Sequence, residues 1–185
     1  MAILTWCRPC VRWCLVVLLL ITGTCRASPP TEYQIKAVFL FNFAQFVEWP
    51  VDAFPDPHTP FVIGVLGKDP FGADLDAVVR GETLDKRSLV IQRYHDIDEL
   101  QHCNILFIGR SQLRELPRIL AALKGRSILT VSDGDAEEQS GVMIRLVTRS
   151  NRIRLRIDVG AAKAGNLVIS SKLLRPAEIV DGGRD

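Results

Sequence analysis

The side chains that could carry out chemistry in this sequence are few and widely spaced. Its three histidines are His58, in a proline-rich stretch, and His95 and His102, which flank a short polar segment. Two histidines seven residues apart can share a helix face, but no Cys, Asp or third His completes a known zinc pattern. A nucleophile beside its base and a catalytic pair of carboxylates are also not recognisable. The residues alone therefore indicate no active site and no metal or cofactor site. They leave open an unrecognised hydrolase, whose histidines and carboxylates would have to converge in the folded chain.

Two loops are the remaining candidates for a ligand site. Gly64, Gly67 and Gly72 surround one apolar run, but their spacing fits neither a dinucleotide fingerprint nor a P-loop. The segment 132–135 follows another apolar run and could bind a cation, but it is shorter than a calcium loop, and a helix-capping turn with its own Asx hydrogen bonds is the favoured interpretation. Ligand crevices form at the carboxyl ends of parallel strands. The candidate crevice comprises Gly67, Lys68, Asp69, Phe71, Ser132 and Asp133.

The segments that position these loops alternate between strand and helix. We expect strands at 61–66, 88–93, 104–108 and 127–131, and helices beginning at 70–71 and spanning 97–101 and 112–123. This alternation predicts an α/β domain whose mostly parallel sheet carries helices on both faces. Runs at 142–148 and 152–157 are joined too closely for anything but an antiparallel hairpin near the C-terminus. A short helix at 159–164, a brief strand at 167–169 and a last segment at 171–179 follow.

The second run of the predicted hairpin has one basic face. Arg152, Arg154 and Arg156 alternate with apolar residues, so the two kinds of side chain point to opposite faces of the strand. Arg145 and Arg149 extend the stripe. It could receive an acidic partner or an anionic polymer, or its charges could prevent edge-to-edge aggregation. The sequence leaves both interpretations open.

The first helix is unusually aromatic. Thr31 and Gln34 form a capping-box pattern, which predicts a helix that begins there and stops near Trp49, before Pro50. It holds four of the eight Phe residues and lacks a clear polar face. Such a helix is either sunk in the core or uses part of its surface to meet a partner or a second copy.

The chain begins with the pattern of a secretory signal peptide. Arg8 and Arg12 precede an uncharged stretch at 13–21 and small residues up to Ala27, after which we expect cleavage. The apolar run is shorter than the roughly 20 residues of a membrane-spanning helix. A lipoprotein signal ending at Cys25 is the competing interpretation. We predict a signal peptide at 1–27, a linker at 28–31, a single domain at 32–180 and a disordered tail at 181–185.

Removing the signal changes how charge and cysteine content are interpreted. Of the 23 Lys and Arg residues, three lie in the signal, which leaves 20 against 21 Asp and Glu and argues against nucleic-acid binding. Only Cys103 remains of the five cysteines, so an internal disulfide is excluded. Its thiol is either buried or available to another chain, and the apolar run that follows favours burial.

Taken together, several blocks of this sequence resemble the YfiR family of periplasmic proteins. They lie at 33–43, 46–50, 60–67, 69–72, 103–108, 129–133, 141–144 and 170–175. The resemblance implies a Rossmann-like domain that self-associates, expected here as a homodimer, and that has no enzymatic activity. It also implies inhibition of an inner-membrane diguanylate cyclase through that enzyme's periplasmic sensor region, which controls cyclic di-GMP signalling and biofilm formation. Some family members carry paired cysteines, so with Cys103 alone an intramolecular redox switch is not expected.

The density of aromatic and motif residues indicates where such a partner would bind. We expect contacts from the end of the first helix and from a segment near the C-terminus, namely Asn42, Phe46, Glu48, Trp49, Ser171, Lys172, Leu173, Leu174 and Arg175. The alternative function is a periplasmic small-solute binding protein that uses the crevice at the strand ends.

Overall fold

The structure, a computed structural model, describes residues 29–134 and 140–180. The predicted signal peptide with Cys25, the predicted tail and Asp135 of the predicted 132–135 turn lie outside the described residues. The chain divides into two units at Pro30, and the second, which begins at Thr31, holds all the described helices and strands.

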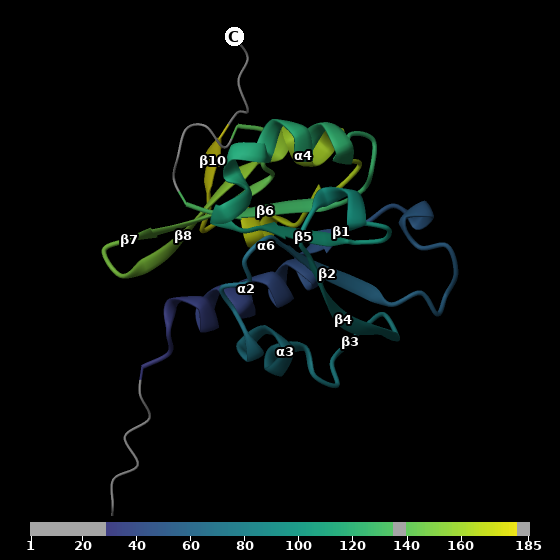
Figure 1. Cartoon of the computed structure of the whole chain (residues 1–185), viewed down its shortest axis with the longest axis horizontal. Helices are drawn as coiled ribbons and strands as arrows, with labels where there is room; N and C mark the ends of the chain where they lie inside the picture. Colours follow the sequence, from purple (N-terminus) through teal and green to yellow (C-terminus); the bar gives the residue numbers. More distant parts are fainter. Residues whose placement is uncertain (1–28, 135–139, 181–185) are drawn as a thin grey trace, which may run out of the picture. The chain divides into compact units, whose positions relative to one another are not determined.

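A mixed sheet of eight strands forms the centre of this unit (Figure 1). Neighbouring strands β4, β2, β5, β6 and β7 run parallel, whereas β8 is antiparallel to β7, β10 is parallel to β8, and β3 is antiparallel to β4. The predicted α/β class with a mostly parallel sheet is therefore confirmed. In sheet order the strands are β10 (Glu178–Val180), β8 (Arg152–Asp158), β7 (Ile144–Arg149), β6 (Leu129–Asp133), β5 (Ile105–Ile108), β2 (Phe61–Leu66), β4 (Arg87–Tyr94) and β3 (Thr83–Leu84).

Helices cover both faces of the sheet, because the central strands are apolar on both sides. In β2, Phe61, Ile63 and Val65 face one cluster of core residues, and Val62 and Leu66 face another. Helices α2 (Glu32–Phe46) and α3 (Ala73–Val79) pack on the first side. The second side is covered by η2 (Ile97–Glu99) and α4 (Leu116–Leu123), and Figure 1 shows α4 opposite α2 and α3.

Some elements differ from their predicted bounds for identifiable reasons. The predicted helix at 112–123 is a 3-10 turn, η3 (Arg110–Glu115), followed by α4, because Pro117 lies in the first turn of α4, where its missing N–H costs nothing. The predicted helix toward Trp49 ends at Phe46, and the next residues form β1 (Val47–Glu48). The remaining elements are η1 (Val51–Ala53), α5 (Val159–Ala164), β9 (Val168–Ile169) and α6 (Ser171–Leu174).

Two tight turns join antiparallel strands. Asp85 and Lys86 connect β3 to β4, and Ser150 and Asn151 connect β7 to β8. All four residues have positive φ, from 48° to 69°, as two-residue hairpin turns with the sheet's own twist require. The β7–β8 pair places Arg149 opposite Arg152 and Arg145 opposite Arg156.

Candidate functional site

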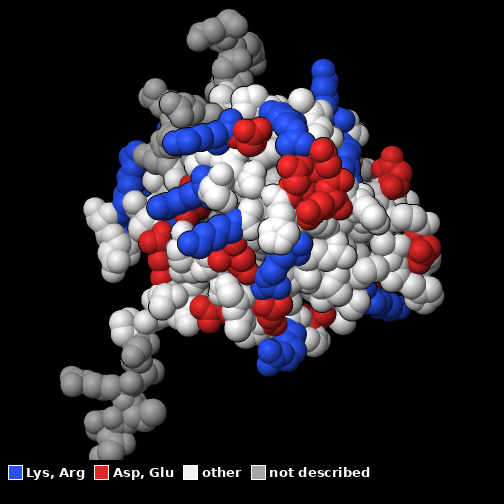
Figure 2. Space-filling view, in the orientation of Figure 1, with Lys and Arg blue, Asp and Glu red and all other residues white. Residues whose placement is uncertain are grey.

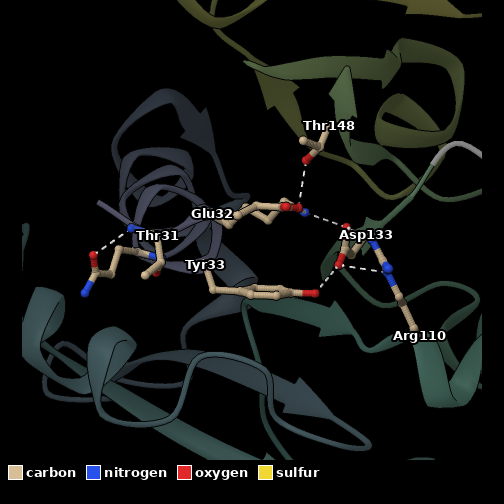
Figure 3. Close-up of polar contacts among 8 residues, drawn as sticks. Thr31, Glu32, Tyr33, Arg110, Asp133 and Thr148 are labelled. Atoms are coloured by element: carbon tan, nitrogen blue, oxygen red, sulfur yellow. Dashed lines mark hydrogen bonds and ion pairs between the residues drawn. The ribbon is translucent and has the colours of Figure 1, made fainter. Parts of the chain in front are cut away.

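The first turn of α2 is fixed by the cap that the sequence predicted. The Thr31 hydroxyl accepts a hydrogen bond from the Gln34 backbone N–H at 3.2 Å, and the Gln34 side chain accepts one from the Thr31 N–H at 2.9 Å. This reciprocal pair satisfies N–H groups that a helix leaves without partners at its start. The helix that follows directs Tyr33 toward Asp133, at the carboxyl end of β6 (Figure 3), and Lys36 contacts the same carboxylate.

Lys36 and Asp133 form a buried ion pair between α2 and the end of β6. Their side chains are 0% and 2% exposed, and Lys36 Nζ lies 2.6 Å from Asp133 Oδ1. Lys36 also pairs with Glu32, one helical turn earlier. The Tyr33 hydroxyl donates to Asp133 Oδ2 at 2.7 Å, and Arg110 Nε lies 3.1 Å from the same oxygen (Figure 3). We call these five residues the Asp133 cluster.

The neighbours of Asp133 determine its charge. Burial alone would raise the pKa of the Asp133 carboxyl, but hydrogen bonds from Lys36 and Tyr33 and the charge of Arg110 hold the pKa below its ordinary value. Burial, reinforced by Asp133, raises the pKa of Tyr33 to about 12. Hydrogen bonds from Lys36 and Thr148 lower the pKa of Glu32. The cluster therefore combines ionised carboxylates with cations and a neutral phenol, which suits a structural lock better than acid–base catalysis near neutral pH.

The predicted crevice is filled by protein groups at the Asp133 cluster. Ser132 and Asp133 are buried at the end of β6. Phe71 is also buried, and its ring stands edge-on to the rings of Tyr33 and Phe107, with centroid distances of 5.6 and 4.7 Å. The Asp133 side chain is 2% exposed, so a solute could reach its carboxylate only by displacing Tyr33, Lys36 or Arg110.

The other crevice residues form an ordinary turn after β2. Gly67 has a φ of +86°, and a Cβ there would lie 2.5 Å from the Ser111 hydroxyl oxygen, so the turn packs closely against η3. The Lys68 N–H donates to the same hydroxyl at 3.0 Å. Asp69 pairs with Arg93 Nε at 2.7 Å. The six residues thus lie at the same end of the sheet. The polar groups of Lys68 and Asp69 described here contact other residues of the protein, namely Ser111 and Arg93.

The chemically reactive residues do not converge. His95 follows the carboxyl end of β4 and His102 precedes the amino end of β5, so they lie at opposite ends of strands that both run parallel to β2. Within residues 29–134 and 140–180, no group of three or more His, Cys, Asp and Glu side chains could hold a metal ion. Cys103 is 4% exposed, and burial raises the pKa of its thiol to about 12. The predicted burial of this cysteine is confirmed.

The two segments predicted to bind a partner lie side by side. Strand β1 pairs antiparallel with β9, which places Glu48 opposite Val168. The Ser170 N–H also donates to the Phe46 carbonyl at 2.9 Å. This pairing joins the end of α2 to the start of α6. Two-residue strands give no readable periodicity, so the sequence did not predict it.

The residues of these two segments differ in exposure. Glu48, Ser171, Lys172 and Arg175 are exposed, and Asn42, Phe46, Trp49 and Leu174 are half-buried. Leu173 requires a correction: it is 5% exposed and packs in the core, so it can support a contact surface only from below. Val168, which the sequence analysis did not select, is 60% exposed beside Glu48. The β1–α6 surface is defined here as Asn42, Phe46, Glu48, Trp49, Val168, Ser171, Lys172, Leu174 and Arg175.

The comparison with protein families covers nearly all of this structure. The family model for YfiR/HmsC-like proteins matches residues 33–178, a span that includes the Asp133 cluster apart from Glu32 and all of the β1–α6 surface. The chain belongs to the YfiR/HmsC-like family. Among curated proteins, none matches the chain. The resemblance inferred from the sequence blocks is therefore confirmed at the level of the family.

In this YfiR/HmsC-like protein, Lys36 is a residue of the cluster that was not predicted from the sequence. Lys36 is buried on the same side of α2 as Ala37 and Leu40, although a lysine in a helix is usually expected to face solvent. The available signal was its position four residues after Glu32, which allows a pair on one helix face. None of the described helices combines the length and apolar character needed to cross a membrane.

Proposed function

We propose that this protein is a non-catalytic periplasmic regulator that binds and inhibits the periplasmic sensor region of an inner-membrane diguanylate cyclase. It thereby controls cyclic di-GMP signalling and biofilm formation. The observation that carries the proposal is the family match over residues 33–178. A signal peptide cleaved after residue 27 delivers the protein to the periplasm, where it acts as a homodimer.

The sensor region binds at the β1–α6 surface. This surface joins half-buried apolar side chains, including Phe46 and Trp49, to exposed charged ones, including Glu48 and Lys172. A mixture of aromatic and polar groups is typical of non-obligate protein interfaces. The Trp49 ring stands edge-on to Phe61 at a centroid distance of 4.9 Å, so the contact surface is anchored to the core.

Inhibition needs no reacting group. A protein that binds the inactive state of a sensor better than the active state shifts the equilibrium toward the inactive state by that difference in affinity. A tenfold shift requires about 1.4 kcal/mol. Complete burial of one large apolar side chain contributes about 1.5 to 3 kcal/mol. One or two side chains of the β1–α6 surface are therefore sufficient.

The proposed homodimer uses a different part of the same helix. Ile35 and Val38, one turn apart on the outer side of α2, are 39% and 45% exposed. Val38→Glu would place a charge in an apolar contact and should convert the dimer into a monomer in sedimentation experiments. If the variant is still a dimer, the dimer contact lies elsewhere on the protein. If the wild type is a monomer, the proposed homodimer is wrong.

The proposed function is tested by crosslinking the mature chain to membranes of its own host. Wild type should capture a diguanylate cyclase, and Trp49→Ala with Leu174→Ala should not. Because both side chains also touch the core, a second double variant, Glu48→Lys with Lys172→Glu, reverses only exposed charges. Arg114→Glu, on the exposed part of η3, is the matched control and should retain capture.

Each outcome of this experiment is informative. Capture that both double variants lose, and that Arg114→Glu keeps, supports inhibition through the β1–α6 surface. Capture of the cyclase by every variant would refute binding at the β1–α6 surface but would still support the cyclase as the partner. Recovery of no membrane protein by the wild type would refute the proposal and favour the alternative, a solute-binding protein.

A further inference from the structure

The hairpin of β7 and β8 carries an arginine-lined groove. The face of this hairpin that points away from the α2 side of the core bears Arg149, Arg152, Arg154 and Arg156, together with the buried Val147. These residues and the segment from Pro176 to Glu178 line a cavity of about 730 Å³. Basic side chains are prominent in Figure 2 on the side where Figure 1 shows β7 and β8. We call this cavity the arginine groove.

The lining of the groove extends along β8. It follows the strand from Arg152 to Arg156, which is roughly 13 Å at about 3.3 Å per residue. Arginines at alternate positions of a strand project on one side at intervals of about 7 Å. A ligand that matches this row needs negative groups with the same repeat, and an extended peptide with acidic residues at alternate positions has it.

The chemistry of the lining favours carboxylates. The guanidinium group has a rigid fork of donors that fits a carboxylate, and Arg156 already uses it inside the protein, where Nη2 lies 3.0 Å from Glu178 Oε1. Arg152 and Arg154 are exposed on the same face, nearer the turn. Glu178 therefore shows how a carboxylate binds at the Arg156 end of the row. At the other end, Arg152 and Arg154 form no ion pair with another described residue.

We propose that the arginine groove binds an extended acidic segment of a protein partner, with carboxylates at alternate positions held by Arg152 and Arg154. The groove begins where the β1–α6 surface ends, because Pro176 directly follows Arg175. This inference rests on the proposed function for the identity of the partner, which would carry the acidic segment next to its main contact. The binding step itself is independent of that identity.

The test uses the purified mature chain and a blocked synthetic peptide of about six residues in which Glu and Thr alternate, roughly 20 Å long when extended. Calorimetry at low ionic strength should detect binding, and added salt should weaken it because exposed charges are screened. The same peptide with Lys in place of Glu should not bind. Absence of binding by the Glu peptide would overturn the proposal.

Variants locate the site. Arg152→Glu with Arg154→Glu should reduce affinity at least tenfold, whereas Arg80→Glu with Arg114→Glu, an equal charge change on exposed residues elsewhere, should have a smaller effect. Glu178→Gln removes the carboxylate that lines the groove and should strengthen binding severalfold. Equal losses in the two double variants would show attraction to net charge alone. Weaker binding by Glu178→Gln would contradict binding of the carboxylates beside Glu178, and either result would overturn the site.

Two further arms separate this inference from competing outcomes. Inorganic triphosphate, a compact polyanion, should compete poorly with the peptide. Effective competition at equal concentration would show that the groove is a general anion site and would overturn the peptide proposal. Crosslinking of Arg152→Glu with Arg154→Glu to host membranes should capture less cyclase than wild type. Undiminished capture would refute a role of the groove in binding the cyclase and leave the proposed function intact. Peptide binding without any captured cyclase would support the groove as an acidic-peptide site and refute the proposed function.

Discussion

Replacing Asp133 with Asn removes the negative charge from the centre of the Asp133 cluster and keeps the shape of the side chain. Lys36 is completely buried, so its ammonium group would lose its 2.6 Å partner without access to water. Breaking a buried ion pair from one side costs about 3 to 5 kcal/mol. Glu32 still contacts Lys36, which favours the lower end, about 3 kcal/mol. A protein of this size should then melt about 6 to 12 °C lower.

Urea and thermal unfolding measure this loss, and a second substitution tests its origin. Lys36→Met in the Asp133→Asn background removes the stranded cation and should recover most of the lost stability, because apolar replacement of a buried pair is often neutral. Lys172→Met, an exposed lysine, is the control and should change little. A loss below about 1 kcal/mol for Asp133→Asn, or a double variant as unstable as the sum of the two singles, would refute the lock.

The pH dependence of stability provides an independent test of the charge on Asp133. The pKa of Asp133 is lower in the folded protein than in the unfolded chain, where it is about 3.9. The stability that this carboxylate contributes is therefore fully present above the unfolded pKa and is lost as the pH falls through the folded pKa. Wild type should lose more stability in this acid range than Asp133→Asn, and parallel pH profiles would contradict the assignment.

The remaining predictions concern buried groups. Burial raises the pKa of both tyrosines, Tyr33 and Tyr94, to about 12, so ultraviolet titration should detect little tyrosinate in the folded protein near pH 10 and normal ionisation in denaturant. Both contributions to stability should be present below the unfolded pKa of about 10 and disappear as the pH rises through the folded values. Cys103 should react with a thiol reagent only after unfolding, and rapid reaction of the native protein would contradict its burial. Gly64→Ala should cost about 1 to 3 kcal/mol in urea unfolding, because its Cβ would lie 2.8 Å from Cys103 Sγ and 2.9 Å from Tyr94 Cε2; an unchanged midpoint would show that the core can yield there.

Patterns that repeat along one segment were enough to predict most of the sheet. Strand β2 matches the predicted run at 61–66, and the start of α2 follows its capping box. The strands β1 and β9, at two residues each, and β10, at three, are defined by partners far away in the sequence. Local periodicity carries no information about such pairings, so the contact between the two halves of the β1–α6 surface could not be predicted.

Of the Asp133 cluster, the sequence predicted the carboxylate but not its buried partner. Asp133 stood out because carboxylates after buried strands mark the ends where ligands bind, and it does lie at such an end. Its partner is Lys36, which lies 97 residues earlier in a helix whose sequence is notable for its Phe residues. Whether a carboxylate faces solvent or a buried cation depends on how α2 docks. That docking is a tertiary contact and leaves no local signature around residue 133.

The long separation between α2 and its partners has a consequence for the order of folding. Helix α2 is the first described element of the chain, but its contacts are with distant residues. Tyr33 binds Asp133, 100 positions later, and Lys36 binds the same residue, 97 positions later. Strand β1 can form only after β9 is available to pair with it. Closing such large loops requires most of the chain to be present and slows folding. The aromatic helix is therefore made first and docks late. During that interval its Phe side chains lack their core partners, and exposed apolar surface of this kind favours aggregation.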